Sequence, residues 1–236
     1  MKRIGIDARF YGEAGPGRYV KNIVLGLEEI DSENEYYIFL KKKDFDTIIF
    51  QNKNFKKIVA NYKWYSFEEQ VFFLIKLISF KLDLLYVPHF NIPIFYPFKM
   101  VTAIPDIIMH SFSTEEGTTL PKFYYKFKKL VYYLVVLIAL VRSKKVIVPS
   151  STTRNDIIGS YPFVNKNKFV LAYEGVDLVL PNLAHEDYEK SYLLFISSMY
   201  KHKNVKRLID AFSILIKKYG YIGNLILVGK KDYFSS

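Results

Sequence analysis

Short apolar runs alternate with longer amphipathic segments along most of this sequence of 236 residues. Short runs rich in Ile, Leu and Val are typical of buried parallel strands, whereas apolar residues at every third or fourth position predict helices that pack on one face. We predict strands at 3–8, 36–40, 57–60, 83–87, 99–104, 145–148, 168–172, 192–196 and 224–228. We predict helices at 18–30, 67–80, 121–141 and 205–218, and one that ends at 158 after a Ser150 or Ser151 cap. This alternation predicts an α/β fold with a mostly parallel sheet.

A polar stretch at 183–191 divides this pattern into two parts. The residues before it, 1–182, carry enough strands and helices for a Rossmann-like domain. After the 183–191 linker, the region 192–236 begins the cycle again with a strand, a helix and a strand. Because a doubly wound domain needs roughly 100 residues or more, we expect the second Rossmann-like domain to be incomplete in this chain.

The composition disfavours several kinds of site. The sequence has no cysteine and only four scattered histidines, so we expect neither a thiolate nucleophile nor a metal site. Its formal net charge of +11 favours an anionic partner. Phosphorylated small molecules, a membrane surface and nucleic acid all fit this charge, which does not choose among them. The first ten residues lack the apolar run of a secretory signal, so we expect a cytoplasmic protein.

A glycine-rich loop at 12–17 joins the first strand to the first helix. In an open parallel sheet, loops at the carboxyl ends of strands border the ligand crevice, and helix N-terminal amides bind phosphates there. The glycine spacing matches neither the dinucleotide fingerprint nor the phosphate-binding loop of nucleoside triphosphatases. The loop is therefore either a phosphate-binding turn without a standard motif or a tight turn without a ligand.

Five segments of the chain resemble one enzyme family, and they occur in the family's order. They are IGIDAR at 4–9 followed by GPGRY at 15–19, LLYVPHF at 84–90, VIVPSSTTRNDI at 146–157, EGVD at 174–177, and the whole of 193–212. In these segments the sequence is similar to family 4 glycosyltransferases, which are retaining enzymes of the GT-B fold. The resemblance spans nearly the whole chain. It implies a complete N-terminal acceptor domain followed by the opening strand, helix and strand of a donor domain.

This resemblance implies transfer of a sugar from a nucleotide-sugar donor to a saccharide or lipid-linked acceptor, with retention at the anomeric carbon. It further implies a role in the synthesis of cell-surface polysaccharides or glycolipids, without an obligatory metal or other cofactor. The pair of glutamates that holds the donor sugar and ribose in the family lies beyond Ser236. We therefore expect the chain as given to be an inactive part of such an enzyme.

The donor phosphates need cations and backbone amides, because negative charge develops on the leaving diphosphate. Lys203 lies just before a predicted helix N-terminus, where its charge and the free amides would meet one diphosphate. The matching lysine of the family contacts the donor phosphates, whereas a solvated surface lysine is the alternative. Ser198 replaces an arginine that many relatives place upstream of this lysine. The donor-phosphate residues that the resemblance implies are Gly15, Gly17, Lys203 and Gly229.

The acceptor side of the site is implied by two strand-end loops. His89 and Asn91 follow the strand at 83–87 and are implied to bind the acceptor, with a hydrogen-bonded loop histidine as the alternative for His89. Asp106 follows the strand at 99–104 and is the implied catalytic residue, with a turn-capping aspartate as the alternative. Pro105 stands where the family usually has a histidine, which argues against an active-site histidine there.

The predicted helix at 121–141 begins with lysines and aromatic residues and continues as an apolar run. The run is shorter than the ~20 residues that span a bilayer, so we expect the second half to pack on the sheet. The first half is either a solvated helix face or a surface that docks on the inner face of an anionic cytoplasmic membrane.

A non-catalytic basic module that binds a membrane or nucleic acid is the competing hypothesis for the whole chain. No nucleic-acid-binding pattern is present and the basic residues are dispersed, so we expect no nucleic acid partner.

Overall fold

The computed structural model describes the chain apart from residues 14, 112–120, 176–190, 201–202 and 230–236. The chain divides into two compact units. The first unit comprises Met1–Ile108 and Phe123–Gly175, and the second comprises Met109–Lys122 and Val176–Ser236. Apart from Ser191, the predicted linker at 183–191 lies outside the described residues, so the domain limits at 182 and 192 stay predictions.

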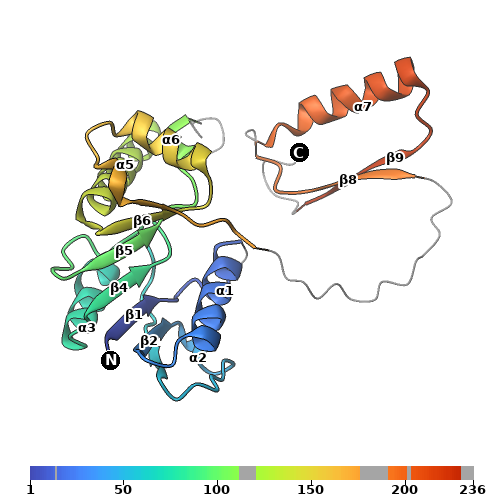
Figure 1. Cartoon of the computed structure of the whole chain (residues 1–236). Helices are drawn as coiled ribbons and strands as arrows, with labels where there is room; N and C mark the ends of the chain where they lie inside the picture. Colours follow the sequence, from blue (N-terminus) through green and yellow to red (C-terminus); the bar gives the residue numbers. More distant parts are fainter. Residues whose placement is uncertain (14, 112–120, 176–190, 201–202, 230–236) are drawn as a thin grey trace. The chain divides into compact units, whose positions relative to one another are not determined.

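The first unit is built on one sheet of seven parallel strands (Figure 1). The strands are β1 (Arg3–Asp7), β2 (Glu35–Leu40), β3 (Phe55–Val59), β4 (Leu84–Val87), β5 (Met100–Ala103), β6 (Lys145–Val148) and β7 (Phe169–Leu171). Their spatial order is β3-β2-β1-β4-β5-β6-β7. Successive strands of the chain are added on one side of β1 up to β3, and on its other side from β4 onwards. The central strands are apolar along nearly their whole length because helices cover both faces of such a sheet. The predicted α/β, Rossmann-like fold is confirmed for this unit.

Helices pack on both faces of the sheet (Figure 1). Helix α1 places Val20 against the face that carries Ile6. The π-helical turn η1 and helix α3 place Phe73 against the opposite face beside Leu85, and α5 and α6 cover the β6 end of that face around Val146. The helical elements of this unit are α1 (Gly15–Ile30), α2 (Lys42–Phe45), η1 (Glu69–Phe73), α3 (Leu74–Ser79), α5 (Lys122–Arg142), α6 (Ser151–Ser160) and η3 (Lys166–Lys168).

Several local features differ from the sequence prediction. Helix α1 begins at Gly15, inside the segment predicted as a loop, because Pro16 lacks only an N–H that the first turn of a helix does not use. The helix predicted at 67–80 contains the π-helical turn η1. Helices α2 and α4 (Ile108–Ser111) were not predicted, since four residues are too few to show a helical period. Ser150 is the cap of α6, because its Oγ accepts the N–H of Thr153 at 3.0 Å.

The second unit contains a strand, a helix and a strand, as predicted. They are β8 (Tyr192–Ile196), α7 (Val205–Tyr219) and β9 (Asn224–Val228), and the two strands pair in parallel. Helix α7 ends at Gly220, whose φ of 66° lies in the left-handed region. Glycine enters this region without the steric cost of a Cβ, and it is the usual residue just after a helix.

Candidate functional site

Three loops of the first unit leave the carboxyl ends of neighbouring strands. They follow β1, β4 and β5, and they contain the glycines at 12–17, His89 and Asp106 respectively. Because the strands are parallel, all three loops lie along one edge of the sheet. The chain passes from β1 to β2 in one direction and from β4 to β5 in the other, and such a reversal is the usual place of a ligand crevice.

A buried ion network lies where β1 ends. Arg9 Nε and Nη2 donate to the two carboxylate oxygens of Asp7 at 2.8 and 2.7 Å. Arg9 Nη2 also donates to Glu69 Oε1 at 2.5 Å. The Arg9 and Glu69 side chains have no solvent exposure. Two-pronged contacts of this kind are among the strongest and most directional hydrogen bonds in proteins.

The charges of this network stabilise one another. Burial by itself lowers the pKa of Arg9, but Asp7 and Glu69 outweigh it, so the pKa of Arg9 is raised. Burial raises the pKa of Glu69, and Arg9 and Asn91 counteract part of that effect. The Arg9 guanidinium also lies 4.0 Å from the centroid of the Phe73 ring, within cation–π range. The loop after β1 is therefore fixed to the η1 turn.

Asn91 connects this network to His89. Its side-chain Nδ2 donates to both carboxylate oxygens of Glu69, at 2.9 and 2.7 Å. Its backbone N–H donates to His89 Nδ1 at 3.1 Å, so the neutral imidazole carries its proton on Nε2. Burial lowers the pKa of His89 to about 4, although the carboxylates of Asp7 and Asp106 act in the opposite direction. His89 is therefore neutral at pH 7, with Nε2–H as a hydrogen-bond donor.

Aromatic rings surround His89. The Phe10 ring stacks on Trp64, with 4.0 Å between the ring centroids, and on His89 at 5.0 Å. The ring centroids of Phe90 and His89 are 4.2 Å apart. The ring of Tyr65 is 6.3 Å from those of both His89 and Phe90. This edge of the sheet therefore combines one neutral histidine with several ring faces.

Asp106 follows β5 on the same edge. Its exposed carboxylate accepts the backbone N–H of Ile108 through Oδ1 at 3.0 Å, as a turn-capping aspartate does. The charge of Asp106 also acts on the imidazole of His89. The structure thus gives Asp106 a capping contact and brings it near His89, while its catalytic role stays a prediction.

Gly15 and Gly17 lie in the first turn of α1 and have different surroundings. Gly15 is exposed, and a Cβ there would meet nothing within 4 Å. Gly17 is buried, and its Cβ would lie 2.4 Å from the carbonyl oxygen of Phe10 and 2.9 Å from that of Tyr11. Gly17 therefore allows α1 to pack closely on the loop after β1. Phosphate binding by either glycine stays a prediction.

A hollow of about 190 Å³ opens beside this first turn of α1. Its lining comes from the first turns of α1 and from the segment after β7: Gly15, Arg18, Tyr19, Asn22, Ile23, Tyr173, Glu174 and Gly175. Inside the unit, the Tyr19 hydroxyl is 2.9 Å from that of Tyr86 on β4. The hydroxyl contact holds the start of α1 against the centre of the sheet.

Lys203 and Gly229 belong to the second unit. Lys203 is exposed in the segment between β8 and α7, and its backbone N–H donates to the carbonyl oxygen of Tyr200 at 2.8 Å. Gly229 directly follows β9, and a Cβ there would lie 2.4 Å from the carbonyl oxygen of Ser197. Because β8 and β9 are parallel, both residues lie at the carboxyl edge of their small sheet. Their contact with donor phosphates stays a prediction.

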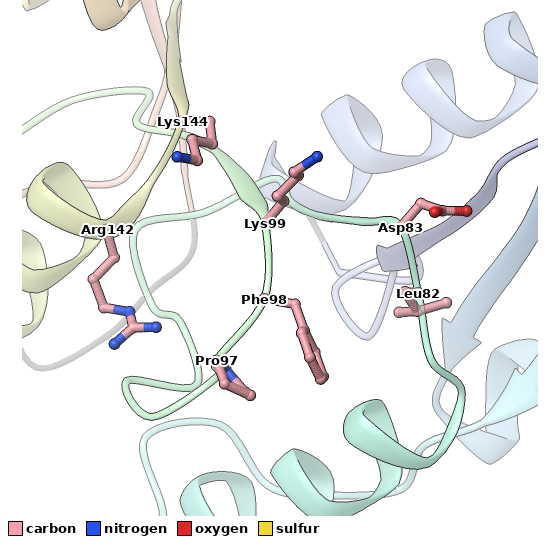
Figure 2. Close-up of a pocket in the computed structure, with 7 residues that line it drawn as sticks. All are labelled: Leu82, Asp83, Pro97, Phe98, Lys99, Arg142 and Lys144. Atoms are coloured by element: carbon pink, nitrogen blue, oxygen red, sulfur yellow. The ribbon is translucent and has the colours of Figure 1, made fainter.

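A more open hollow of about 570 Å³ lies at the opposite, amino-terminal edge of the large sheet (Figure 2). It is lined by residues that lead into β4, β5 and β6: Leu82, Asp83, Pro97, Phe98, Lys99, Arg142 and Lys144. Figure 2 shows the charged ends of Lys99, Arg142 and Lys144 pointing in different directions, and Arg142 donates to the carbonyl oxygen of Tyr96. None of the predicted site residues lines this hollow.

The described part of the chain contains neither a cluster of metal-ligating groups nor a membrane span. No three His, Asp or Glu side chains there are arranged to hold a metal ion. No helix in those same residues has the length and apolar character needed to cross a bilayer. The first half of α5 exposes Phe123, at 85%, and Phe127, whereas Tyr125 in that half and Val136 and Leu140 in the second half are buried.

Arg9 and Glu69 are site residues that the sequence analysis did not single out. Arg9 stands in a motif that resembles the family, but nothing in its spacing indicates a buried ion pair. Glu68 and Glu69 near the start of the helix predicted at 67–80 are equally explained by the helix dipole, which favours carboxylates near a helix N-terminus. A signal was present, because Glu69 is four residues before Phe73 and therefore lies on the apolar face of that helix.

Comparisons with known proteins give limited information about this chain. No protein-family model matches the sequence, and a search of curated proteins found no similar sequence. One solved structure, a UDP-N-acetylglucosamine 2-epimerase, is similar with a TM-score of 0.48 and 10% identity, over 99% of this chain and 69% of that one. A glycosyltransferase from Rickettsia africae ESF-5 is similar with a TM-score of 0.44 and 13% identity, over 98% of this chain and 68% of that one. At these values neither likeness says what the chain binds or catalyses.

Proposed function

We propose that this chain belongs to a nucleotide-sugar-dependent glycosyltransferase of the GT-B type, related in its motifs to family 4. In this proposal the first unit binds a saccharide or lipid-linked acceptor, and the second unit binds the donor diphosphate. The reaction retains the configuration of the anomeric carbon, requires no metal, and serves the synthesis of a cell-surface polysaccharide or glycolipid.

One arrangement carries the proposal. His89, held neutral with its donor on Nε2, lies near the Asp106 carboxylate at the point where the strand order of the sheet reverses. A neutral donor beside an anionic acceptor suits a ligand rich in hydroxyl groups, since each hydroxyl both donates and accepts. The buried contacts of Asn91 with Glu69 hold the loop of His89 in place before any ligand arrives.

Each proposed residue has a stated chemical task. An acceptor hydroxyl oxygen forms a bond to the anomeric carbon on the face from which the diphosphate leaves. The bond from that carbon to the diphosphate oxygen breaks, and the hydroxyl proton passes to the departing diphosphate oxygen. His89 Nε2–H donates to an acceptor oxygen, and Asp106 accepts the hydrogen bond of the attacking hydroxyl. Lys203, with the backbone amides at the start of α7 and at Gly229, stabilises the negative charge that develops on the diphosphate.

The proposal is tested by binding and by transfer, measured separately. We expect saturation-transfer NMR to detect UDP, GDP or their glucose and mannose conjugates on the purified chain, and Lys203→Gln to weaken that signal. Lys206→Gln is the matched control, because Lys206 is an exposed lysine of the first turn of α7. Transfer is followed as label moving from these donors to a pool of saccharide and lipid-linked acceptors. We expect little or none from this chain by itself, and Asp106→Asn should reduce any transfer at least tenfold. A chain that binds no nucleotide sugar overturns the proposal.

A peripheral contact with the inner face of the cytoplasmic membrane is part of the proposal. The first half of α5 exposes Phe123, Tyr124 and Phe127 beside exposed Lys126 and Lys128. Aromatic rings next to cations suit an anionic lipid interface. We expect the chain to sediment with phosphatidylglycerol vesicles and not with phosphatidylcholine vesicles, and a double change of Phe123 and Phe127 to Ser to abolish sedimentation. Equal sedimentation of the double variant, or stronger binding to unrelated DNA than to vesicles, contradicts this part.

A further inference from the structure

Tyr65 has an unusual backbone conformation for a tyrosine. Its φ is 55°, in the left-handed region that a residue with a Cβ rarely adopts. Its backbone N–H donates to Glu69 Oε2 at 3.0 Å. Because Glu69 is in turn held by Arg9 and Asn91, the buried network fixes Tyr65 in this conformation.

The strained conformation does not serve to bury the ring. The Tyr65 side chain is 63% exposed, although it is large and aromatic. Its ring meets the ring of His89 edge-on, at an interplanar angle of 74°, and the ring of Phe90 at 40°. The two neighbours brace the Tyr65 ring at its side and leave much of its surface in water, next to the proposed acceptor site.

The helix that follows Tyr65 is also irregular. It contains the π-helical turn η1 from Glu69 to Phe73, and single π-helical turns are frequent at functional sites. The irregular turn contains the carboxylate that accepts the Tyr65 N–H. Backbone strain that the surrounding structure maintains clusters at ligand-binding positions, and the inference runs from the observed strain to a function.

We infer that Tyr65 binds the acceptor by stacking its ring on the apolar face of a pyranose, and so contributes to acceptor specificity. This inference rests on the proposed function, because it assigns a sugar to the site beside His89. An aromatic ring carries partial negative charge on its face, which attracts the partially positive C–H groups of a sugar. A pyranose whose hydroxyl groups are mostly equatorial presents several axial C–H groups on one face. The acceptor class is therefore a saccharide that ends in a sugar of the gluco or galacto type.

The test uses binding of defined pyranosides to the whole chain. Methyl β-D-glucopyranoside, methyl β-D-galactopyranoside and methyl α-D-mannopyranoside are titrated against the purified protein by saturation-transfer NMR. The fluorescence of Trp64 gives a second readout, because it is the only tryptophan and it stacks on Phe10 beside His89. We expect at least one gluco- or galactopyranoside to bind, with the strongest saturation on the C–H groups of one ring face.

Three variants distinguish the effect of losing the Tyr65 ring from a general effect on folding. Tyr65→Gly removes the ring but suits the left-handed backbone, so the protein stays folded and binding weakens roughly tenfold. Tyr65→Phe keeps the ring and binds within about twofold of wild type. Phe67→Ala is the matched control, because Phe67 is an exposed ring two residues away with an ordinary φ.

The outcomes distinguish this inference from the proposed function. Unchanged pyranoside binding by Tyr65→Gly overturns the inference, as does a wild-type protein that binds none of the three pyranosides. Loss of pyranoside binding in both Tyr65→Gly and Phe67→Ala also overturns it, because the effect is then not specific to Tyr65. If pyranosides bind through Tyr65 but no nucleotide sugar binds, the inference stands for a saccharide-binding protein and the transferase proposal fails.

Discussion

Arg9 Nη2 lies 2.5 Å from Glu69 Oε1, and neither side chain is exposed to solvent. The contact joins residues that are 60 positions apart in the sequence. Asp7 accepts hydrogen bonds from Nε and Nη2 of the guanidinium, and Asn91 attaches the loop of His89 to the Glu69 carboxylate. The residues that face the proposed acceptor therefore depend on one buried group of charges.

The first prediction concerns the stability of that group. Arg9→Met leaves the carboxylates of Asp7 and Glu69 buried without their cation, so it should lower the free energy of unfolding by about 3–5 kcal/mol. Lys43→Met is the control, because its ion pair with Glu13 is exposed to solvent and contributes little to stability. Urea denaturation followed by circular dichroism measures both. If the free energy of unfolding fell equally in the two variants, the buried ion network would stabilise the protein no more than the exposed ion pair does.

The second prediction concerns Gly17 and Gly26 of α1. Gly17→Ala places a Cβ against the carbonyl oxygens of Phe10 and Tyr11, so the backbone must shift and stability should fall by about 1–3 kcal/mol. Gly26→Ala meets no atom within 4 Å and should stabilise the helix by about 0.5–1 kcal/mol. Thermal melting compares the two variants. A stable Gly17→Ala variant contradicts the close packing of α1 on the loop after β1.

The third prediction concerns pH. The pKa of His89 is lowered from 6.5 in the unfolded chain to about 4 in the folded protein, so between these values the unfolded state binds more protons. The contribution to stability is complete above pH 6.5 and is lost as the pH falls to about 4. The free energy of unfolding of wild type should therefore fall by about 3 kcal/mol more than that of His89→Gln over this window. Identical pH profiles mean that the imidazole is not buried in neutral form.

The fourth prediction concerns the start of α6. Ser150→Ala removes the oxygen that accepts the Thr153 N–H, so it should cost about 1 kcal/mol. Ser151→Ala is the natural comparison, because Ser151 is exposed and is the first residue of the helix rather than its cap. It should leave the stability within about 0.5 kcal/mol of wild type. The reverse order of the two effects would make Ser151 the cap.

Tertiary contacts explain why parts of the site were not predictable from sequence. Asn91 was predicted to bind an acceptor, and in the structure its side-chain amide donates to both carboxylate oxygens of Glu69, 22 residues away. A spacing pattern within one loop contains no information on such a distant partner. Asp106 shows the converse case, because its capping contact with Ile108 is local and was one of two stated alternatives.

The sequence alone determined which segments become strands and in which loops the chemistry lies. Strands that are buried on both faces must be apolar throughout, so β2, β4 and β6 are visible as short apolar runs. The alternation of strands with helices then implies a parallel sheet, whose loops meet at one edge. His89 and Asp106 could be assigned to that edge without a structure.

Only the tertiary structure decided how those loops are held. The neutral state of His89 results from burial by neighbouring elements, and the left-handed backbone of Tyr65 results from a hydrogen bond to a carboxylate that Arg9 and Asn91 hold. Local propensity disfavours both the buried Glu69 and the positive φ of Tyr65. Each becomes stable because partners distant in sequence compensate its cost, and that compensation exists only in the folded chain.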